Sequence, residues 1–256
     1  MKKIFFILLA FIVATGIVIT TTSYNFKKQS IPANTVVVTN GFAVMELFTS
    51  QGCSSCPPAD ELLGKYAAQN NSNIIPLSFH VDYWNRLGWK DSFSTGGYSQ
   101  RQRQYAQLFS NSSVYTPQVI INGTAEMLGS DENKIAVAVA KAIGETPSAI
   151  ITIKRNEIVG DKIAIQYSLA GDITNNNILA LLVQNKASTK IKAGENDGAT
   201  LTSYNVVRSI VSSSAKTEGS CILPVPLNIS LKDVSLVLFI QNVHSLKITG
   251  AIKKML

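Results

Sequence analysis

Hydrophobic positions in the first half of the chain follow two spacings. Short apolar runs suit buried strands, and the segments between them carry apolar residues at helical spacing. Strands are predicted at 42–48, 74–81 and 119–122, and helices at 59–69, 98–109 and 130–142. A short strand over 126–128 follows the Asn122-Gly123 turn as its hairpin partner. Helices that lie between strands favour parallel pairing, so this half is predicted to be an α/β unit.

The pattern changes after Pro147, where strand-like alternation replaces the helical spacing. Strands are predicted at 150–154, 162–169, 178–184, 205–211 and 235–241. A series of short strands separated by turns is typical of an antiparallel sandwich. We therefore predict a small, mostly antiparallel, sandwich-like β domain over 147–256, preceded by an α/β domain over 41–146.

The N-terminus has the pattern of an export signal. Lys2 and Lys3 precede an apolar run from Ile4 to Ile19, and polar residues follow it. Residues 1–22 are predicted to be a signal peptide or an N-terminal membrane anchor, and 23–40 a linker. Because the run is short for a membrane span, a cleaved signal peptide is favoured over an uncleaved anchor. The expected location is the periplasm or cell envelope.

The charge of the chain does not point to nucleic acid. The formal net charge is +7, but the basic residues are spread along the sequence, whereas a nucleic-acid face needs clustered Lys and Arg with aromatic residues between them. The nearest approach is Arg101 and Arg103 with Tyr98 and Tyr105. We expect these four residues to form a solvated helix face, and we expect no nucleic-acid partner.

Two of the three cysteines, Cys53 and Cys56, form a Cys-x-x-Cys unit between a predicted strand and a predicted helix. A helix N-terminus stabilises a thiolate, and this spacing lets the second thiol attack a mixed disulfide formed by the first. Cys53 is the predicted attacking thiol, nearer the exterior, and Cys56 is the predicted resolving thiol. Pro57 and Pro58 favour a helix that starts after the pair, which weakens the stabilisation of Cys53.

Other roles for the cysteine pair have less support. Zinc needs four ligands, but only Cys221, His80 and His244 remain as candidates, so no metal site is predicted. Copper handling through soft thiolates is a minor alternative, because no Met-rich or paired His motif lies nearby. An inert structural disulfide is permitted in an exported protein. Cys221 itself is expected to be a buried small hydrophobe.

A long series of motifs accompanies the cysteine pair along the sequence. They comprise Val44 to Gly52, Pro57 to Asp60, His80 to Trp84, Leu87 to Asp91, Arg101 to Arg103, Tyr115 to Gln118, Asn122-Gly123, Gly194 to Asn196, and Asn205 to Arg208. From about residue 41 to the C-terminus, the series resembles the DUF1223 family of secreted thioredoxin-like proteins. The resemblance implies a thioredoxin-like fold for 41–146 and implies little about the substrate.

The resemblance also implies roles for three residues. In the thioredoxin pattern, a Thr-Pro bond at the start of the third strand is cis and faces the disulfide, and Thr116 and Pro117 fit that position. The alternative is an ordinary proline at a strand start. Glu46 is similar to the buried acid that accepts a proton in thioredoxins, and a raised pKa would let it exchange a proton with Cys56. The alternative is a Glu46 side chain that points to solvent.

Residues that follow the second predicted strand are candidates for a binding groove. His80 and Asp82 lie at the carboxyl end of that strand, where open α/β sheets place their sites. A hydrogen-bonded structural histidine is the simpler explanation of His80. Trp84, with Tyr83 and Trp89, is predicted to form a lid or partner-binding wall, with packing between the two domains as the alternative.

These observations favour a thiol-disulfide oxidoreductase of the cell envelope. It would exchange disulfides with exported proteins, or with small-molecule thiols and disulfides, through Cys53 and Cys56. No cofactor is expected. The main alternative is a non-catalytic binding or sensing module on a thioredoxin scaffold, because a fold alone does not establish chemistry. No chemistry is predicted for Gly194 to Asn196.

Overall fold

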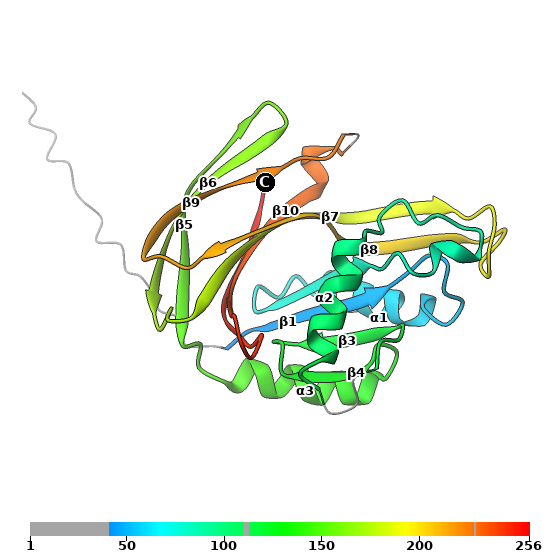
Figure 1. Ribbon diagram of the computed structural model, residues 1–256, viewed down its shortest axis with the longest axis horizontal. Helices are drawn as coiled ribbons and strands as arrows, with labels where there is room; N and C mark the ends of the chain where they lie inside the picture. The colour runs from blue at the N-terminus through cyan, green and yellow to red at the C-terminus, as the bar shows by residue number, and fades with distance from the viewer. Residues whose placement is uncertain (1–40, 110–112, 228) are drawn as a thin grey trace, which may run out of the picture. The chain divides into compact units, whose positions relative to one another are not determined.

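The computed structural model describes residues 41–109, 113–227 and 229–256 (Figure 1). The signal or anchor segment predicted at 1–22 and the linker predicted at 23–40 lie outside the described residues. Among the residues that are described, no helix is long and apolar enough to cross a membrane.

The first half contains each strand and helix that the hydrophobic pattern predicts. The elements are β1 (Ala43–Thr49), α1 (Pro57–Ala68), β2 (Ile74–His80), α2 (Gly96–Ala106), β3 (Gln118–Ile121), β4 (Ala125–Leu128) and α3 (Glu132–Gly144), with a short 3-10 helix at Asn85–Leu87. Asp131 caps α3, since its side chain accepts the Lys134 N–H. Predicted and observed ends differ by a few residues, as is usual for helix termini.

The second half consists of strands. They are β5 (Ala149–Val159), β6 (Lys162–Gly171), β7 (Asn176–Lys190), β8 (Thr200–Ser214), β9 (Glu218–Pro224), β10 (Val234–Asn242) and β11 (Ile248–Met255), with a 3-10 turn at Leu231–Asp233. The sequence pattern did not predict β9 or β11, and it predicted much shorter strands for β7 and β8. The extra length of β7 and β8 is a polar hairpin whose side chains are largely half-buried or exposed, so it lacks the apolar run of a buried strand.

Within the described residues, the strands form a large mixed sheet of order β11-β10-β7-β8-β2-β1-β3-β4 and a small antiparallel sheet of order β5-β6-β9. β1 and β2 are parallel, and β3 is antiparallel to β1. A parallel bridge between Ser78 of β2 and Val206 of β8 joins strands from the two halves of the chain. The predicted domain division at residue 147 therefore falls within one sheet-sharing unit and stays a prediction.

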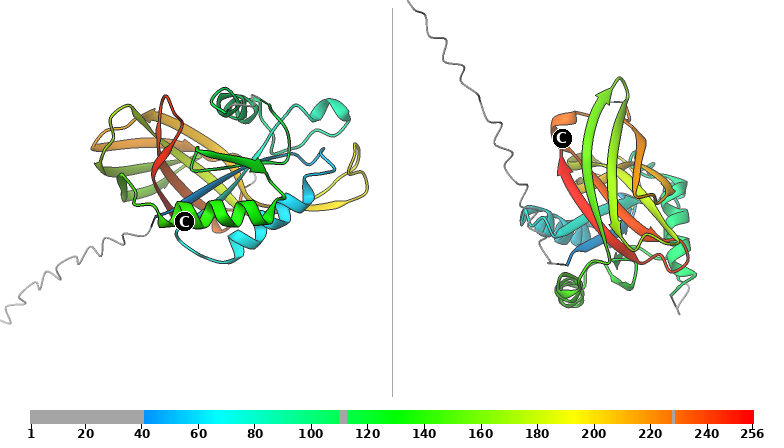
Figure 2. Two further views of the ribbon diagram at one scale, coloured as in Figure 1. Left: turned by 90° about the horizontal axis from the view of Figure 1, so that it is seen from below. Right: turned by 90° about the vertical axis from the view of Figure 1, so that its left-hand side faces the viewer.

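Strand β1 is buried on both faces, which places the helices around it. Met45 and Leu47 pack with side chains of α1 and α3, such as Leu63. Val44 and Phe48, which point the opposite way, pack in the cluster that includes Tyr98 and Tyr105 of α2. Figure 2 shows α1 and α3 on one side of these strands and α2 on the other. Glu46 points in the same direction as Val44 and Phe48, toward α2.

The small sheet packs against one face of the large sheet. Leu182 of β7 and Leu238 of β10 share a core with Ile165 and Tyr167 of β6. The alternate residues of the same strands, such as Phe239, belong to the core beneath α2. The protein is thus a sheet-rich α/β structure with a large mixed sheet and a small antiparallel sheet.

Candidate functional site

Cys53 and Cys56 form a disulfide in the loop between β1 and α1, with their Cα atoms 5.4 Å apart. The Cys53 N–H donates to the Ser50 carbonyl at 3.2 Å, and the Cys56 N–H donates to the Cys53 carbonyl at 3.3 Å. Helix α1 begins at Pro57 with Cys56 as its N-cap, because proline needs no hydrogen bond at the first helical position. Cys53 therefore lies one turn before the helix.

Both cysteines are 0% exposed, whereas Ser54 and Ser55 between them are exposed. In this disulfide-bonded state the exposed fractions do not place Cys53 nearer the exterior than Cys56, so that expectation stays a prediction. Cys53 Sγ lies 3.3 Å from Ser55 Oγ and 3.3 Å from Thr116 Oγ1, and these groups cover it. A partner sulfur can reach Cys53 only after such neighbours move.

The loop before β3 lies against Cys53. The Thr116–Pro117 peptide bond is cis, and the Thr116 carbonyl oxygen lies 4.0 Å from Cys53 Sγ. Trp84 Nε1–H donates to Thr116 Oγ1 at 2.8 Å, which leaves the hydroxyl proton free to point at the sulfur. Three of the residues predicted to bind a partner, Thr116, Pro117 and Trp84, are thus in one loop cluster at the disulfide.

Trp89 contacts the same region from the segment that follows β2. Its Nε1–H donates to Gln51 Oε1 at 3.1 Å, and Gln51 Nε2–H donates to Thr189 Oγ1 at 3.0 Å. Trp89 therefore anchors the loop after β2 to the cysteine segment, and Trp84 anchors it to the loop before β3. Gln51 in turn links the cysteine segment to the β7–β8 hairpin. That Trp84 and Trp89 form a lid or a partner-binding wall stays a prediction.

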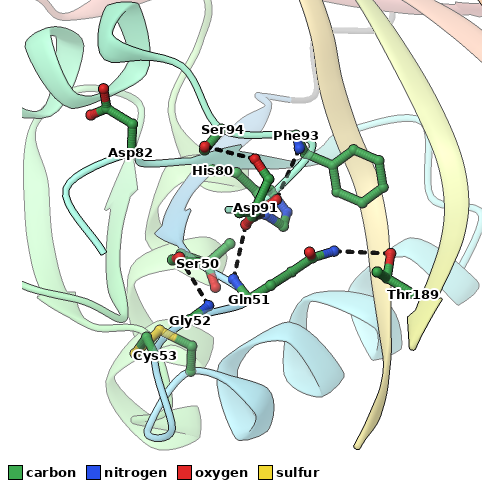
Figure 3. Close-up of polar contacts among 12 residues, drawn as sticks. Ser50, Gln51, Gly52, Cys53, His80, Asp82, Asp91, Phe93, Ser94 and Thr189 are labelled. Atoms are coloured by element: carbon green, nitrogen blue, oxygen red, sulfur yellow. Dashed lines mark hydrogen bonds and ion pairs between the residues drawn. A yellow bond between two sulfur atoms is a disulfide. The ribbon is translucent and has the colours of Figure 1, made fainter. Parts of the chain in front are cut away.

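His80 is buried and paired with Asp91, at 2.7 Å between Nδ1 and Oδ2 (Figure 3). The same carboxylate accepts the Gln51 N–H at 2.9 Å, so the pair holds the start of the cysteine loop. Burial alone would lower the pKa of His80, but the charge of Asp91 and its hydrogen bond raise it. Burial opposes ionisation of Asp91 in turn, yet His80 and the backbone donors hold its pKa below the ordinary value.

Asp60, on the first turn of α1, is a buried acid for which the sequence pattern predicted no role in the site. Thr49 Oγ1–H donates to its Oδ2 at 3.1 Å, and its N–H donates to the Cys56 carbonyl at 3.1 Å. Burial raises the pKa of Asp60 to about 7, although the charge of His80 lowers it in part. The sequence does indicate this position, because Asp60 is four residues after Cys56 and three before Leu63. At helical spacing these residues share one face of the helix, and that face is buried.

Four buried side-chain polar atoms lack a hydrogen-bond partner among the described residues, and three of them lie near the cysteine loop: Asp60 Oδ1, Ser78 Oγ and His80 Nε2, the fourth being Asn176 Oδ1. Ser78 and His80 alternate with Phe79, which packs on the α2 side, so their side chains point toward α1. Asp60 comes from α1 itself. Buried polar groups normally have partners, and a buried water between α1 and β2 would satisfy these atoms.

Glu46, predicted to exchange a proton with Cys56, lies instead in a buried ion pair. Its carboxylate accepts from Arg101 Nε at 2.6 Å and from Tyr105 Oη at 2.5 Å, and Glu46 is 0% exposed. Because it points toward α2, it lies on the opposite face of β1 from α1 and its acid Asp60. Arg101, Tyr98 and Tyr105 are buried as well, so the expected solvated helix face is wrong for them.

Asp82 is not joined to the cysteines by any hydrogen bond within the described part of the chain. Its Oδ1 accepts from Ser99 Oγ at 2.5 Å, and the Asp82 N–H donates to the same hydroxyl at 3.1 Å. Figure 3 shows its carboxylate pointing away from Cys53. This contact links the end of β2 to α2, and the Asp82 side chain does not line the disulfide.

The β7–β8 hairpin brings two further residues to the site. Asn196 Nδ2–H donates to the carbonyls of Gln51 at 2.9 Å and Cys53 at 3.0 Å. The Ser54 N–H donates to Glu195 Oε2 at 3.0 Å. More than 140 residues separate these partners in sequence, so local patterns could not indicate the contacts.

Cys221 lies away from the pair, on β9, and is half-buried against the core of the small sheet. Burial raises the pKa of its thiol to about 11, which makes it a poor nucleophile at neutral pH. Across residues 41–109, 113–227 and 229–256, no group of three or more His, Cys, Asp or Glu side chains is placed to hold a metal ion.

Fold and site together define a mixed-sheet α/β protein with a buried Cys-x-x-Cys disulfide at the start of a helix. The chain belongs to the DUF1223 family, described as proteins of unknown function, whose family model matches residues 44–241. This confirms the family resemblance that the motifs indicate. The comparison with curated proteins found no match.

Solved structures that are similar to this chain include two that cover most of it. The crystal structure of protein AGR_C_4864 from Agrobacterium tumefaciens is 28% identical, with a TM-score of 0.65, covering 83% of this chain and 93% of that one. HBP35 of Porphyromonas gingivalis is 17% identical, with a TM-score of 0.59, covering 85% of this chain and 76% of that one. The second likeness concerns the fold alone.

Proposed function

We propose that the chain is a thiol-disulfide oxidoreductase of the cell envelope that exchanges disulfides with exported proteins or with small-molecule thiols and disulfides. The observation that carries the proposal is the position of the cysteine pair. The disulfide lies between β1 and α1, and Cys53 Sγ is 3.3 Å from the hydroxyl of Thr116. A hydroxyl donor at this distance favours the thiolate that thiol exchange requires.

A thioredoxin-like fold for residues 41–146 is part of the proposal. The strand order β2-β1-β3-β4 supports it, with β3 antiparallel to β1 and helices on both faces. The Cys-x-x-Cys unit immediately before the first helix also supports it. Residues 147–256 then form a second, β-rich domain, whose β7–β8 hairpin contributes to the site.

In the reducing direction, the Cys53 thiolate attacks one sulfur of a partner disulfide. A bond forms between Cys53 and that sulfur, the partner's S–S bond breaks, and the other partner sulfur leaves as a thiolate. Cys56 then attacks Cys53 Sγ, the Cys53–Cys56 disulfide forms, and the second partner thiolate is released. Two electrons pass from the pair to the partner, and the oxidising direction reverses these steps.

Cys56 must lose a proton before it attacks, and Asp60 is the acid that we assign to this step. It is buried, it lies in the next turn from Cys56, and burial raises its pKa to about 7. A group with a pKa near the working pH transfers protons most effectively.

Trapping of the mixed disulfide tests this function. The reduced Cys56→Ser protein, incubated with a peptide that contains a disulfide, should accumulate a covalent adduct at Cys53 that dithiothreitol releases. Cys53→Ser should give no adduct and no exchange, while Cys221→Ser should behave as the wild type. Exchange that persists in Cys53→Ser would refute the assignment.

The burial of both sulfurs favours a second candidate, a binding or sensing module in which the disulfide is structural. An inaccessible disulfide is slow to exchange because access limits the attack. In this case the folded wild-type protein would retain its disulfide in excess dithiothreitol, and Cys56→Ser would form no adduct. The same trapping experiment therefore separates the two candidates.

A further inference from the structure

The tip of the β7–β8 hairpin, residues 191–199, is a defined turn that packs against the loop that carries Trp89. Ile191 N–H donates to the Ala199 carbonyl at 2.9 Å, which closes the turn. Gly194 has a φ of +78°, and a β-carbon added there would lie 3.2 Å from Trp89 Cβ. Glycine suits this position because its backbone adopts positive φ without a steric penalty.

Asn196 fixes this hairpin tip to the cysteine loop. Its amide donates to the carbonyl of Gln51 and to the carbonyl of Cys53, at 2.9 and 3.0 Å. The Gln51 side chain in turn donates to Thr189 of β7. Three hydrogen bonds therefore hold the hairpin against the cysteine loop, and they place the residue next to Asn196 beside the Cys-x-x-Cys unit.

That neighbour is Glu195, whose carboxylate accepts the N–H of Ser54, between the two cysteines. The hydrogen bond from Ser54 lowers the pKa of Glu195, so the group is ionised at neutral pH. Within the described residues, no cation forms an ion pair with Glu195. A negative charge without an ion-pair partner among the described residues is thus hydrogen-bonded to the loop in which a thiolate forms.

The other acids close to this loop differ from Glu195 in their surroundings. Asp91, which accepts the Gln51 N–H, is balanced by His80. Asp60 is buried one turn into α1 and has a raised pKa. The groups in contact with Cys53 Sγ are neutral hydroxyl and carbonyl oxygens.

We propose that Glu195, held in place by Asn196, is a positioning residue that opposes formation of the Cys53 thiolate. A nearby negative charge disfavours a second one, and the carboxylate also occupies a backbone N–H inside the Cys-x-x-Cys unit. The hairpin of the β-rich half thereby sets the reactivity of a cysteine in the α/β half. This inference rests on the proposed thiol exchange, and it adds the group that restrains it.

The test uses the full chain in a Cys56→Ser/Cys221→Ser background, in which Cys53 is the single remaining cysteine. The rate of alkylation by iodoacetamide at pH 6 reports the thiolate fraction. Glu195→Gln keeps an oxygen for the Ser54 N–H but removes the charge, so alkylation should be on the order of threefold faster. Asp197→Asn, which removes an exposed charge from the same tip, should leave the rate unchanged.

Two further readouts separate charge from a purely structural role. The gain in Glu195→Gln should shrink in 1 M KCl, because salt screens exposed charges. In an Asn196→Ala background the Glu195→Gln substitution should have less effect, since the tip is no longer held on the loop. Equal rates for Glu195→Gln and Asp197→Asn would overturn the inference. If the wild-type disulfide reduces normally in parallel, the proposed function survives that result; if it never reduces, both fail.

Discussion

The hydroxyl of Thr116 donates a hydrogen bond to Cys53 Sγ at 3.3 Å, across 63 residues of sequence. Trp84 donates to the same hydroxyl oxygen, so the Thr116 proton is directed at the sulfur. A disulfide sulfur is a weak acceptor, whereas a thiolate is a strong one. The contact therefore stabilises the reduced, ionised form of Cys53 more than the disulfide.

Thr116→Val removes this donor and keeps the shape of the side chain. We expect alkylation of Cys53 to require a higher pH in Thr116→Val, because the thiolate loses a hydrogen bond. The pH profile of iodoacetamide alkylation in the single-cysteine background measures the change. Thr116→Ser, which keeps a hydroxyl, is the matched control, and a profile for Thr116→Val that coincides with it would contradict the prediction.

Asp60→Asn should change how stability depends on pH. The pKa of Asp60 is raised from 3.8 to about 7 in the folded protein, so between these values the folded state binds a proton that the unfolded chain lacks. The free energy of unfolding therefore falls as the pH rises through this window. Asn has no proton to lose, and its advantage should grow from pH 4 to pH 7, reaching at most about 4 kcal/mol.

Denaturant unfolding of the oxidised protein at several pH values measures this difference. Asp161→Asn, at an exposed turn position between β5 and β6, is the control and should follow the wild type. A constant difference between Asp60→Asn and the wild type across the window would show that Asp60 is ionised throughout.

Substitutions at Glu46 and at Asp60 should have opposite effects on two quantities, the stability of the fold and the rate at which a partner is released. Glu46→Gln leaves Arg101 without its carboxylate, and losing one partner of a buried ion pair costs about 3–5 kcal/mol. It should not slow the release of a partner from a mixed disulfide at Cys53. Asp60→Asn should slow that release, on the order of 100-fold, because Cys56 loses its proton acceptor.

Rapid mixing of the reduced protein with a fluorescent peptide disulfide follows the release step directly. Slow release in Glu46→Gln with normal release in Asp60→Asn would restore the role that the thioredoxin resemblance implies for Glu46. Both variants should be tested at a pH where each is folded, since stability and release are separate readouts.

Much of the fold follows from the sequence because its elements carry local signals. The strand that includes Leu47 and the helix that begins at Pro57 show apolar spacing and a helix-start proline. β11 was missed because half-buried Lys253 and exposed Lys254 interrupt the apolar pattern. Pairing of β8 with β2 is a tertiary event that no local pattern records.

In the site, too, some residues carry a local sequence signal and others are brought in only by tertiary contacts. Cys53, Cys56, Thr116 and Trp84 form motifs that the sequence makes visible, and they come together. The partner of Glu46 could not be predicted, because Arg101 is on a helix 55 residues away and looks like a surface residue in isolation. Glu195 and its neighbour reach the cysteines only through the long polar hairpin.

The reduction potential of the Cys53–Cys56 pair tests the central claim most directly. The protein is equilibrated with glutathione and dithiothreitol buffers, free thiols are trapped, and the reduced fraction is fitted for a two-electron couple. Thiol exchange predicts a reversible transition between about −270 and −120 mV, the range of known exchange proteins. A pair that stays oxidised in the folded protein below about −300 mV would contradict the account and identify a structural disulfide.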